Sequence, residues 1–151
     1  MSLSENDLRS RVLPQVQEIR DRLRSTLAAL NTTAVMRAIP PGERLRLARE
    51  AKASARAEAH RFKAVVEAVS NDAGRVIQSI LTEIEYGRDA AAEKADYIKA
   101  HGHTAYLDHQ RAERKKLAGA VEAAAEAILR AHAARKKPSP APRVFFPDSA
   151  A

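Results

Sequence analysis

The stretch FKAVVEAVSNDAGRVIQSILTEI, residues 62–84, is the most apolar segment of this 151-residue chain. Its large apolar side chains recur every three or four residues, the spacing that keeps them on one face of an α-helix. Ala73 fills the single gap in this series, and neighbouring residues widen it. The resulting apolar band consists of Phe62, Val65, Val66, Val69, Val76, Ile77, Ile80, Leu81 and Ile84. The spacing predicts that a helix through this band forms the centre of the fold.

The middle of the band contains residues that are typical of a turn. Within residues 70–74, either Ser70 or Asn71 has the side chain to cap a new helix. However, the apolar residues keep their helical spacing through Ala73, and a loop would not require that spacing. We therefore expect one continuous helix over about residues 43–99, bent near Gly74, with a turn at residues 71–74 as the alternative.

A first helix is predicted over about residues 5–30. Ser4 is placed to cap it, and apolar residues repeat every three or four positions from Leu8 to Leu30. Pro14 interrupts the series, because a proline inside a helix removes a hydrogen bond and clashes with the preceding turn, at about 3 kcal/mol. The prediction is a kink or a short leading turn, with the main helix running from about Pro14 to Leu30.

Two strong stop signals delimit the remaining helices. Residues 40–42 read Pro-Pro-Gly and end a connection over residues 31–42, and residues 101–103 read His-Gly-His. A last helix is expected over about residues 104–137. The predicted fold is therefore all-α: an elongated, antiparallel bundle of coiled-coil type, in which one long central helix is flanked by two helices. Residues 1–137 would form this helical domain, and residues 138–151 a proline-rich spacer and an extended tail.

Such an arrangement is only two helices thick. Two layers cannot cover a wide apolar surface on all sides, and large exposed apolar surfaces mark sites of association. The sequence therefore predicts a homo-oligomer that is held together through the apolar band.

Several classes of function are disfavoured. There is no cysteine, so disulfides and thiolate metal sites are absent. His101, His103 and His109 match no common metal-site spacing, and no glycine-rich phosphate loop, nucleophile elbow or metalloprotease motif is present. We expect no enzyme, no cofactor and no metal. Because no segment is typical of a signal peptide or a membrane span, we also expect a cytoplasmic protein with no membrane partner.

The charge favours a polyanionic partner. The net charge is +7, with basic residues concentrated in residues 31–61 and 100–137. One set, the basic stripe, shares a helix face at steps of three or four and could follow a phosphate backbone. The basic stripe consists of Arg49, Lys52, Arg56, His60 and Lys63. A second basic cluster on the last helix consists of Arg111, Arg114, Lys115 and Lys116.

No base-reading motif accompanies these residues, and the stacking aromatics of single-strand binders are missing. Binding would therefore be sequence-tolerant. The alternative is a solvated helix face, partly neutralised by Glu43, Glu50 and Glu58, whose basic bias reflects genome composition. We further expect the second basic cluster to pair with an acidic face on the central helix. That acidic face consists of Glu85, Asp89, Glu93 and Asp96. Tyr86 and Tyr97 share a face and are expected to be packing residues.

The C-terminal tail contains two of the three phenylalanines of the chain. Its apolar part follows the spacer and consists of Arg143, Val144, Phe145, Phe146 and Pro147. Aromatic side chains in such a segment are typical of a docking peptide, and the alternative is that they cover the chain's own apolar band or that of a sister subunit. The favoured function is a non-enzymatic adaptor that self-assembles and docks to a larger assembly through this tail. The alternative is a nucleic-acid-binding protein of the kind that packages phage or mobile-element DNA or associates with chromosomes.

Overall fold

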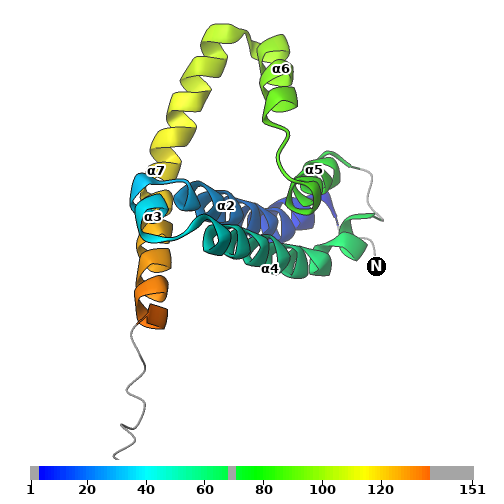
Figure 1. The fold of residues 1–151 in the computed structure, drawn as a ribbon. Helices are drawn as coiled ribbons and strands as arrows, with labels where there is room; N and C mark the ends of the chain where they lie inside the picture. The colour runs from blue at the N-terminus through cyan, green and yellow to red at the C-terminus, as the bar shows by residue number, and fades with distance from the viewer. Residues whose placement is uncertain (1–3, 68–70, 137–151) are drawn as a thin grey trace, which may run out of the picture.

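The computed structural model describes residues 4–67 and 71–136, and these residues form helices and no strand. The all-α class is therefore confirmed for the described part of the chain. The elements are α1 (Glu5–Asp7), the π-helical turn η1 (Leu8–Val12), α2 (Leu13–Leu30), α3 (Thr33–Ala38), α4 (Pro41–Glu67), α5 (Asp72–Tyr86), α6 (Ala90–His101) and α7 (His103–Lys136) (Figure 1). No helix among the described residues is both long enough and apolar enough to cross a membrane.

The prediction of one continuous helix over residues 43–99 is wrong. Asn71 has extended backbone angles, and its Oδ1 accepts a hydrogen bond of 2.7 Å from the backbone N–H of Gly74. A second break follows α5, where Gly87 has a φ of 92° and Asp89 accepts from a backbone N–H of α6 at 3.0 Å. Each cap satisfies a donor that a new helix leaves unpaired, so both breaks are stable in this sequence. Three helices, α4, α5 and α6, replace the single one expected.

The main helix begins beside Pro14, as predicted from the sequence. The helix α2 begins at Leu13, and Pro14 lies in its first turn, where a missing N–H is tolerated. Before it, the backbone N–H of Leu13 donates to the carbonyl of Leu8, five residues back, as in a π-helix. This wider turn lets the chain enter α2 in a helical conformation despite the proline.

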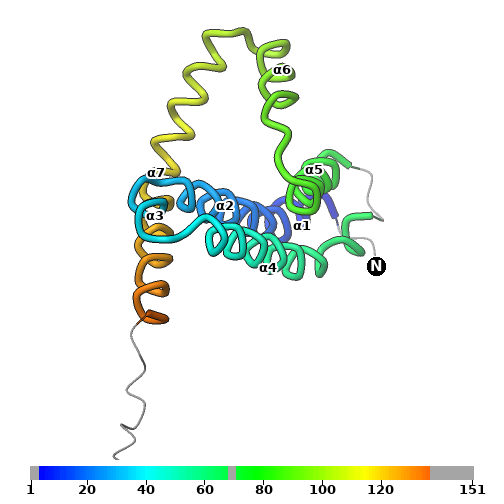
Figure 2. The backbone as a smooth tube through the Cα atoms, in the orientation of Figure 1, coloured from blue at the N-terminus to red at the C-terminus, as the bar shows by residue number. Residues whose placement is uncertain are grey.

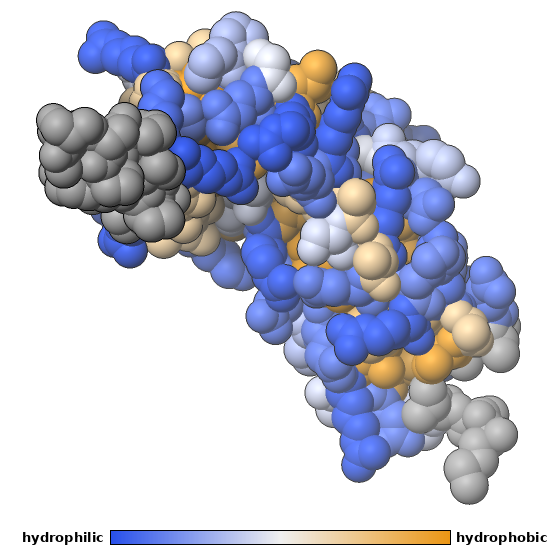
Figure 3. All heavy atoms as spheres, turned by 60° about the horizontal axis from the view of Figure 1, so that its bottom comes forward, coloured by the Kyte–Doolittle hydropathy of each residue, from blue (hydrophilic) through white to orange (hydrophobic). Residues whose placement is uncertain are grey.

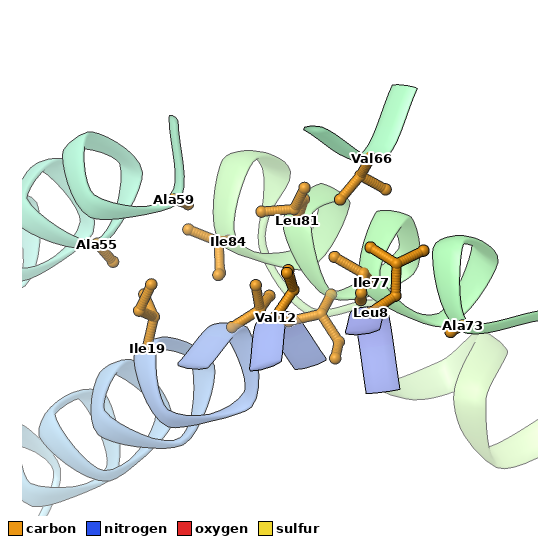
Figure 4. Packing of buried hydrophobic residues seen from close by; sticks show 12 residues of the cluster. Leu8, Val12, Ile19, Ala55, Ala59, Val66, Ala73, Ile77, Leu81 and Ile84 are labelled. Carbon is orange, nitrogen blue, oxygen red and sulfur yellow. The ribbon is translucent and has the colours of Figure 1, made fainter. Parts of the chain in front are cut away.

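Two apolar clusters lie at opposite ends of α2. At the start of α2, this helix and η1 pack with the second half of α4 and with α5. The helix α5 crosses α2 and α4 (Figures 1 and 2). Side chains from all four elements meet there (Figure 4). This first cluster includes Leu8, Val12, Val16, Ile19, Ala55, Ala59, Val66, Ala73, Ile77, Ile80, Leu81 and Ile84. It is the main core of the molecule.

The second cluster lies at the end of α2 and holds the last helix. The buried residues Leu30, Val35 and Ile39 contact Ala125 of α7 and its half-buried neighbours. The helix α3, which we did not predict, forms inside the connection and carries Val35 into this cluster. His132 Nδ1 of α7 lies 3.2 Å from Glu43 Oε1 at the start of α4. These contacts attach the second half of α7 to the helical body.

The bundle differs from the expected elongated arrangement. The pair α2 and α4 is antiparallel, but α7 crosses the end of α2 instead of returning along a long central helix (Figure 1). The first half of α7 leaves the body and pairs with α6, which contains no buried residue. The result is a projecting hairpin of α6 and the first half of α7.

Candidate nucleic-acid interface

The helix α4 presents most of the basic stripe to solvent. Arg49, Lys52, Arg56 and His60 are exposed. The adjacent face of the same helix is buried against α2 and α5 through small residues such as Ala55 and Ala59. Each of these alanines directly precedes a member of the basic stripe, and successive residues of a helix are rotated by about 100°, so the buried face lies beside the basic stripe.

Lys63, the fifth member of the stripe, is partly neutralised. It is half-buried, and its Nζ forms an ion pair with Glu85 of α5. This hydrogen bond from Lys63 is the main cause that lowers the pKa of Glu85 below its ordinary value of 4.5, against an opposing desolvation effect. The charges of Lys63, His60 and Arg56 lower the pKa of Glu85 further. The carboxylate therefore stays ionised and lies in the field of the stripe.

The carboxylates expected to neutralise the stripe are engaged elsewhere. Glu50 pairs with Arg46 at 2.8 Å, and Glu58 pairs with Arg22 at 3.0 Å. Glu43 contacts Arg46, His132 and Arg135. Within residues 4–67 and 71–136, no ion pair involves the side chains of Arg49, Lys52 or Arg56. Three adjacent cations of α4 are thus exposed without an anionic partner in the described part of the chain.

The second basic cluster is also exposed and unpaired among the described residues. The prediction that it pairs with the acidic face is wrong. Glu85 is bound by Lys63, Glu93 pairs with Arg88 at 2.8 Å, and Asp89 caps α6. The break at residues 87–89 divides the acidic residues between α5 and α6. They therefore do not form the single face that a continuous helix would have given.

Lys52 and Arg56 also line a cleft of about 240 Å³ between α2, α4 and the end of α5. Leu23, Leu27 and Ile84 contribute its apolar wall. Deeper in, Arg24 donates two hydrogen bonds to Glu83, from Nε at 2.7 Å and from Nη2 at 2.8 Å. This largely buried pair fixes α5 against α2 and thereby holds the two sides of the cleft at a set separation.

Tyr86 lines the same cleft and is 84% exposed. The expectation that it is a packing residue is wrong, whereas Tyr97 does pack. The Tyr97 ring lies 4.6 Å from that of His109 and 4.7 Å from that of His101, measured between centroids. Tyr86 is the functional candidate that sequence reasoning missed. The signal was the following Gly87, which ends α5 and leaves the ring at a helix terminus instead of on a packed face.

The apolar band lies mostly inside the molecule. Its buried members within the chain's own main core are Val66, Ile77, Ile80, Leu81 and Ile84. Phe62 and Val65 are half-buried beside them, Val76 is 43% exposed, and Val69 lies outside the described residues. The physical reason for expecting self-association through this band is therefore removed, because α5 folds this face onto η1 and α2. On the face drawn in Figure 3, apolar residues form separate patches between hydrophilic ones. Self-association itself stays a prediction.

The tail residues 143–147 lie outside the described residues, so the docking hypothesis stays a prediction. Of the three histidines near the second stop signal, His101 and His109 contact Tyr97, and His103 begins α7. Within the described ranges, no three histidine or carboxylate side chains are grouped so that they could hold a metal ion. Comparison with known protein families, with characterised proteins and with solved structures found no significant match to this chain.

Proposed function

We propose that this protein binds nucleic acid through the phosphate backbone. The observation that supports this most directly is the exposed group Arg49, Lys52 and Arg56 on α4, which has no anionic partner among the described residues. The nearby carboxylates are committed to other cations. A polyanion would meet this face without first having to break an ion pair.

The binding free energy would come largely from counterion release. Each phosphate that a lysine or arginine neutralises frees condensed cations, so affinity falls steeply as salt rises. Contacts of this kind position the protein on the backbone but carry no sequence information. The proposal is therefore a sequence-tolerant binder, as would suit a packaging or chromosome-associated role.

The second basic cluster extends this proposal. Its four cations lie on the first half of α7, in the projecting hairpin, and none of them belongs to the two apolar clusters that stabilise the body. Glu85 and Glu93 are paired with other cations and Asp89 caps α6, so these carboxylates do not neutralise the four cations. The hairpin would contribute a further set of phosphate contacts.

The test is a comparison of two triple variants that change the net charge equally. One variant removes the α4 cations: Arg49→Gln, Lys52→Gln and Arg56→Gln. The control removes three exposed arginines that each pair with a carboxylate three or four residues away: Arg9→Gln, Arg75→Gln and Arg130→Gln.

Binding is measured by fluorescence anisotropy with a labelled duplex and a labelled single strand over a range of salt concentrations. Three lost phosphate contacts should reduce the slope of log K against log salt by about 2.7 for a duplex and by about 2.1 for a single strand. The control variant should keep the wild-type slope. Equal losses in both variants would mean that net charge alone, and not the α4 surface, governs binding. No binding by the wild-type protein to either oligonucleotide would refute the proposed function.

A second candidate function is the adaptor role, and the sequence observation that favours it is the apolar segment at residues 143–147. In this proposal the protein self-assembles and the tail docks to a larger assembly. Truncation after Lys137 should then abolish capture of the partner and leave the helix content measured by circular dichroism unchanged. Loss of self-assembly in the truncated protein, measured by light scattering, would instead assign the tail to subunit contacts.

A further inference from the structure

We infer that the cleft between α2, α4 and α5 accepts an unstacked nucleobase on Tyr86, so that the preferred ligand is a single strand. This inference rests on the proposed function and names its substrate class. It is carried by the juxtaposition, in one cleft, of an exposed aromatic ring with the cations Lys52 and Arg56. An aromatic face and a nearby cation are the two elements that single-strand binding sites combine.

Tyr86 differs from the other aromatic side chains of the described residues. Phe62, Tyr97 and Tyr106 are half-buried and contact other parts of the chain. Tyr86 is 84% exposed at the last position of α5, where Gly87 turns the chain away. Its ring is therefore free to stack with a ligand, and stacking would remove an aromatic face from water.

The charges around the cleft suit a phosphate beside the base. The two carboxylates that line it are each held by a cation: Glu83 by Arg24 and Glu85 by Lys63. Lys52 and Arg56 have no ion-pair partner within the described residues. A phosphate group at these two cations would complete the pairing of charges in the cleft.

The size and lining of the cleft favour one nucleotide unit. Its volume, about 240 Å³, lies below the roughly 300–1,000 Å³ typical of pockets for drug-sized ligands. Leu23, Leu27 and Ile84 provide an apolar wall that suits the flat face or edge of a base. In a duplex the bases are stacked on one another and cannot offer a face to Tyr86, whereas a single strand can.

The experiment compares Tyr86→Ala and Tyr86→Phe with the wild-type protein at one fixed salt concentration. The ligands are a labelled oligothymidine, the matching oligouridine and a duplex of the same length. Tyr86→Ala should weaken single-strand binding about tenfold, because loss of one base–aromatic stack has an effect of that size. Tyr86→Phe should keep the wild-type affinity, and duplex binding should be the same in all three proteins. Leu107→Ala, which removes a 43% exposed apolar side chain of α7, is the control and should bind like the wild type.

A second measurement uses the absence of tryptophan from the chain. In a Tyr86→Trp variant the single indole should be quenched by oligothymidine and not by the duplex. Unchanged single-strand affinity of Tyr86→Ala, or an equal loss for single strand and duplex, would overturn the inference and leave the proposed function standing. Failure of the wild-type protein to bind any of the three ligands would refute the proposed function together with this inference.

Discussion

Replacement of Ile77 by alanine tests whether the apolar band is the chain's own core or a surface between subunits. Ile77 is fully buried in the main core. The substitution removes three carbons, about 2.4 kcal/mol at ~0.8 kcal/mol per buried CH₂ group. The cavity that remains adds to this loss, within the range of about 2–5 kcal/mol seen for such changes. We therefore expect the free energy of unfolding to fall by about 3 kcal/mol.

The assay is thermal and urea unfolding followed by circular dichroism, over a wide range of protein concentration. A loss of about 3 kcal/mol corresponds to a fall in Tm of roughly 6–12 °C for a chain of this size. Because the contacts of Ile77 lie within one chain, the substitution should lower Tm by the same amount at every protein concentration.

The neighbouring Val76 provides a matched control. Its side chain is 43% exposed, and Val76→Ala should change the free energy of unfolding by no more than about 0.5 kcal/mol. If Val76→Ala were as destabilising as Ile77→Ala, or if Ile77→Ala abolished a dependence of Tm on protein concentration that the wild type shows, the band would lie in an intermolecular interface. Either result would refute the placement of the band in the core of a single chain.

Three further predictions concern an ion pair, a helix cap and two glycines. Glu85→Gln should tighten nucleic-acid binding in anisotropy titrations, because it releases Lys63. Since Lys63 lowers the pKa of Glu85, the wild-type carboxylate is charged at pH values above 4.5. The gain in affinity of Glu85→Gln over the wild type should therefore disappear only as the pH falls below that value. A weaker affinity of Glu85→Gln at neutral pH would contradict this prediction. Asn71→Ala should reduce the free energy of unfolding in urea by about 0.5–2 kcal/mol, whereas Asn71→Asp should keep the cap; equal losses would argue against capping. Gly102→Ala should destabilise the protein by about 1–3 kcal/mol, because its φ of 90° and ψ of 164° are strained for alanine. Gly119→Ala, inside α7 with open space around it, should stabilise the protein by about 0.5–1 kcal/mol. Melting curves of the two variants that shift in the same direction would refute this contrast.

The limits of the sequence prediction are clearest at residues 70–74. The apolar phase passes through Ala73 without a shift, and Ala73 is indeed buried with the rest of the band. The phase is preserved because α4 and α5 pack on the same core, and not because one helix continues. Periodicity reports which side chains are buried, and two helices that share a core produce the same pattern as one.

The ion pairs show a second limit. The acidic residues from Glu85 to Asp96 recur at helical spacing, yet the break at Gly87 separates Glu85 from the others. Glu85 pairs with Lys63 of α4, and Glu93 pairs with Arg88 of the break and with Arg24 of α2. None of these partners is a cation of α7. Which charges meet depends on the directions that the chain takes at its breaks, and these directions are set by contacts far apart in the sequence.

The sequence by itself determined the helical class, the start of α2 beside Pro14, the end of α6 before Gly102, and the cations that share the exposed face of α4. These features depend on interactions within one or two turns, between residues that the sequence places next to one another. Only the tertiary structure decided that the apolar band is the core of a single chain, that the carboxylates near the basic stripe are already paired, and that Tyr86 is exposed beside Lys52 and Arg56. Those outcomes depend on how α5 crosses α2 and α4, which is the result of burying apolar surface from all of these helices at once.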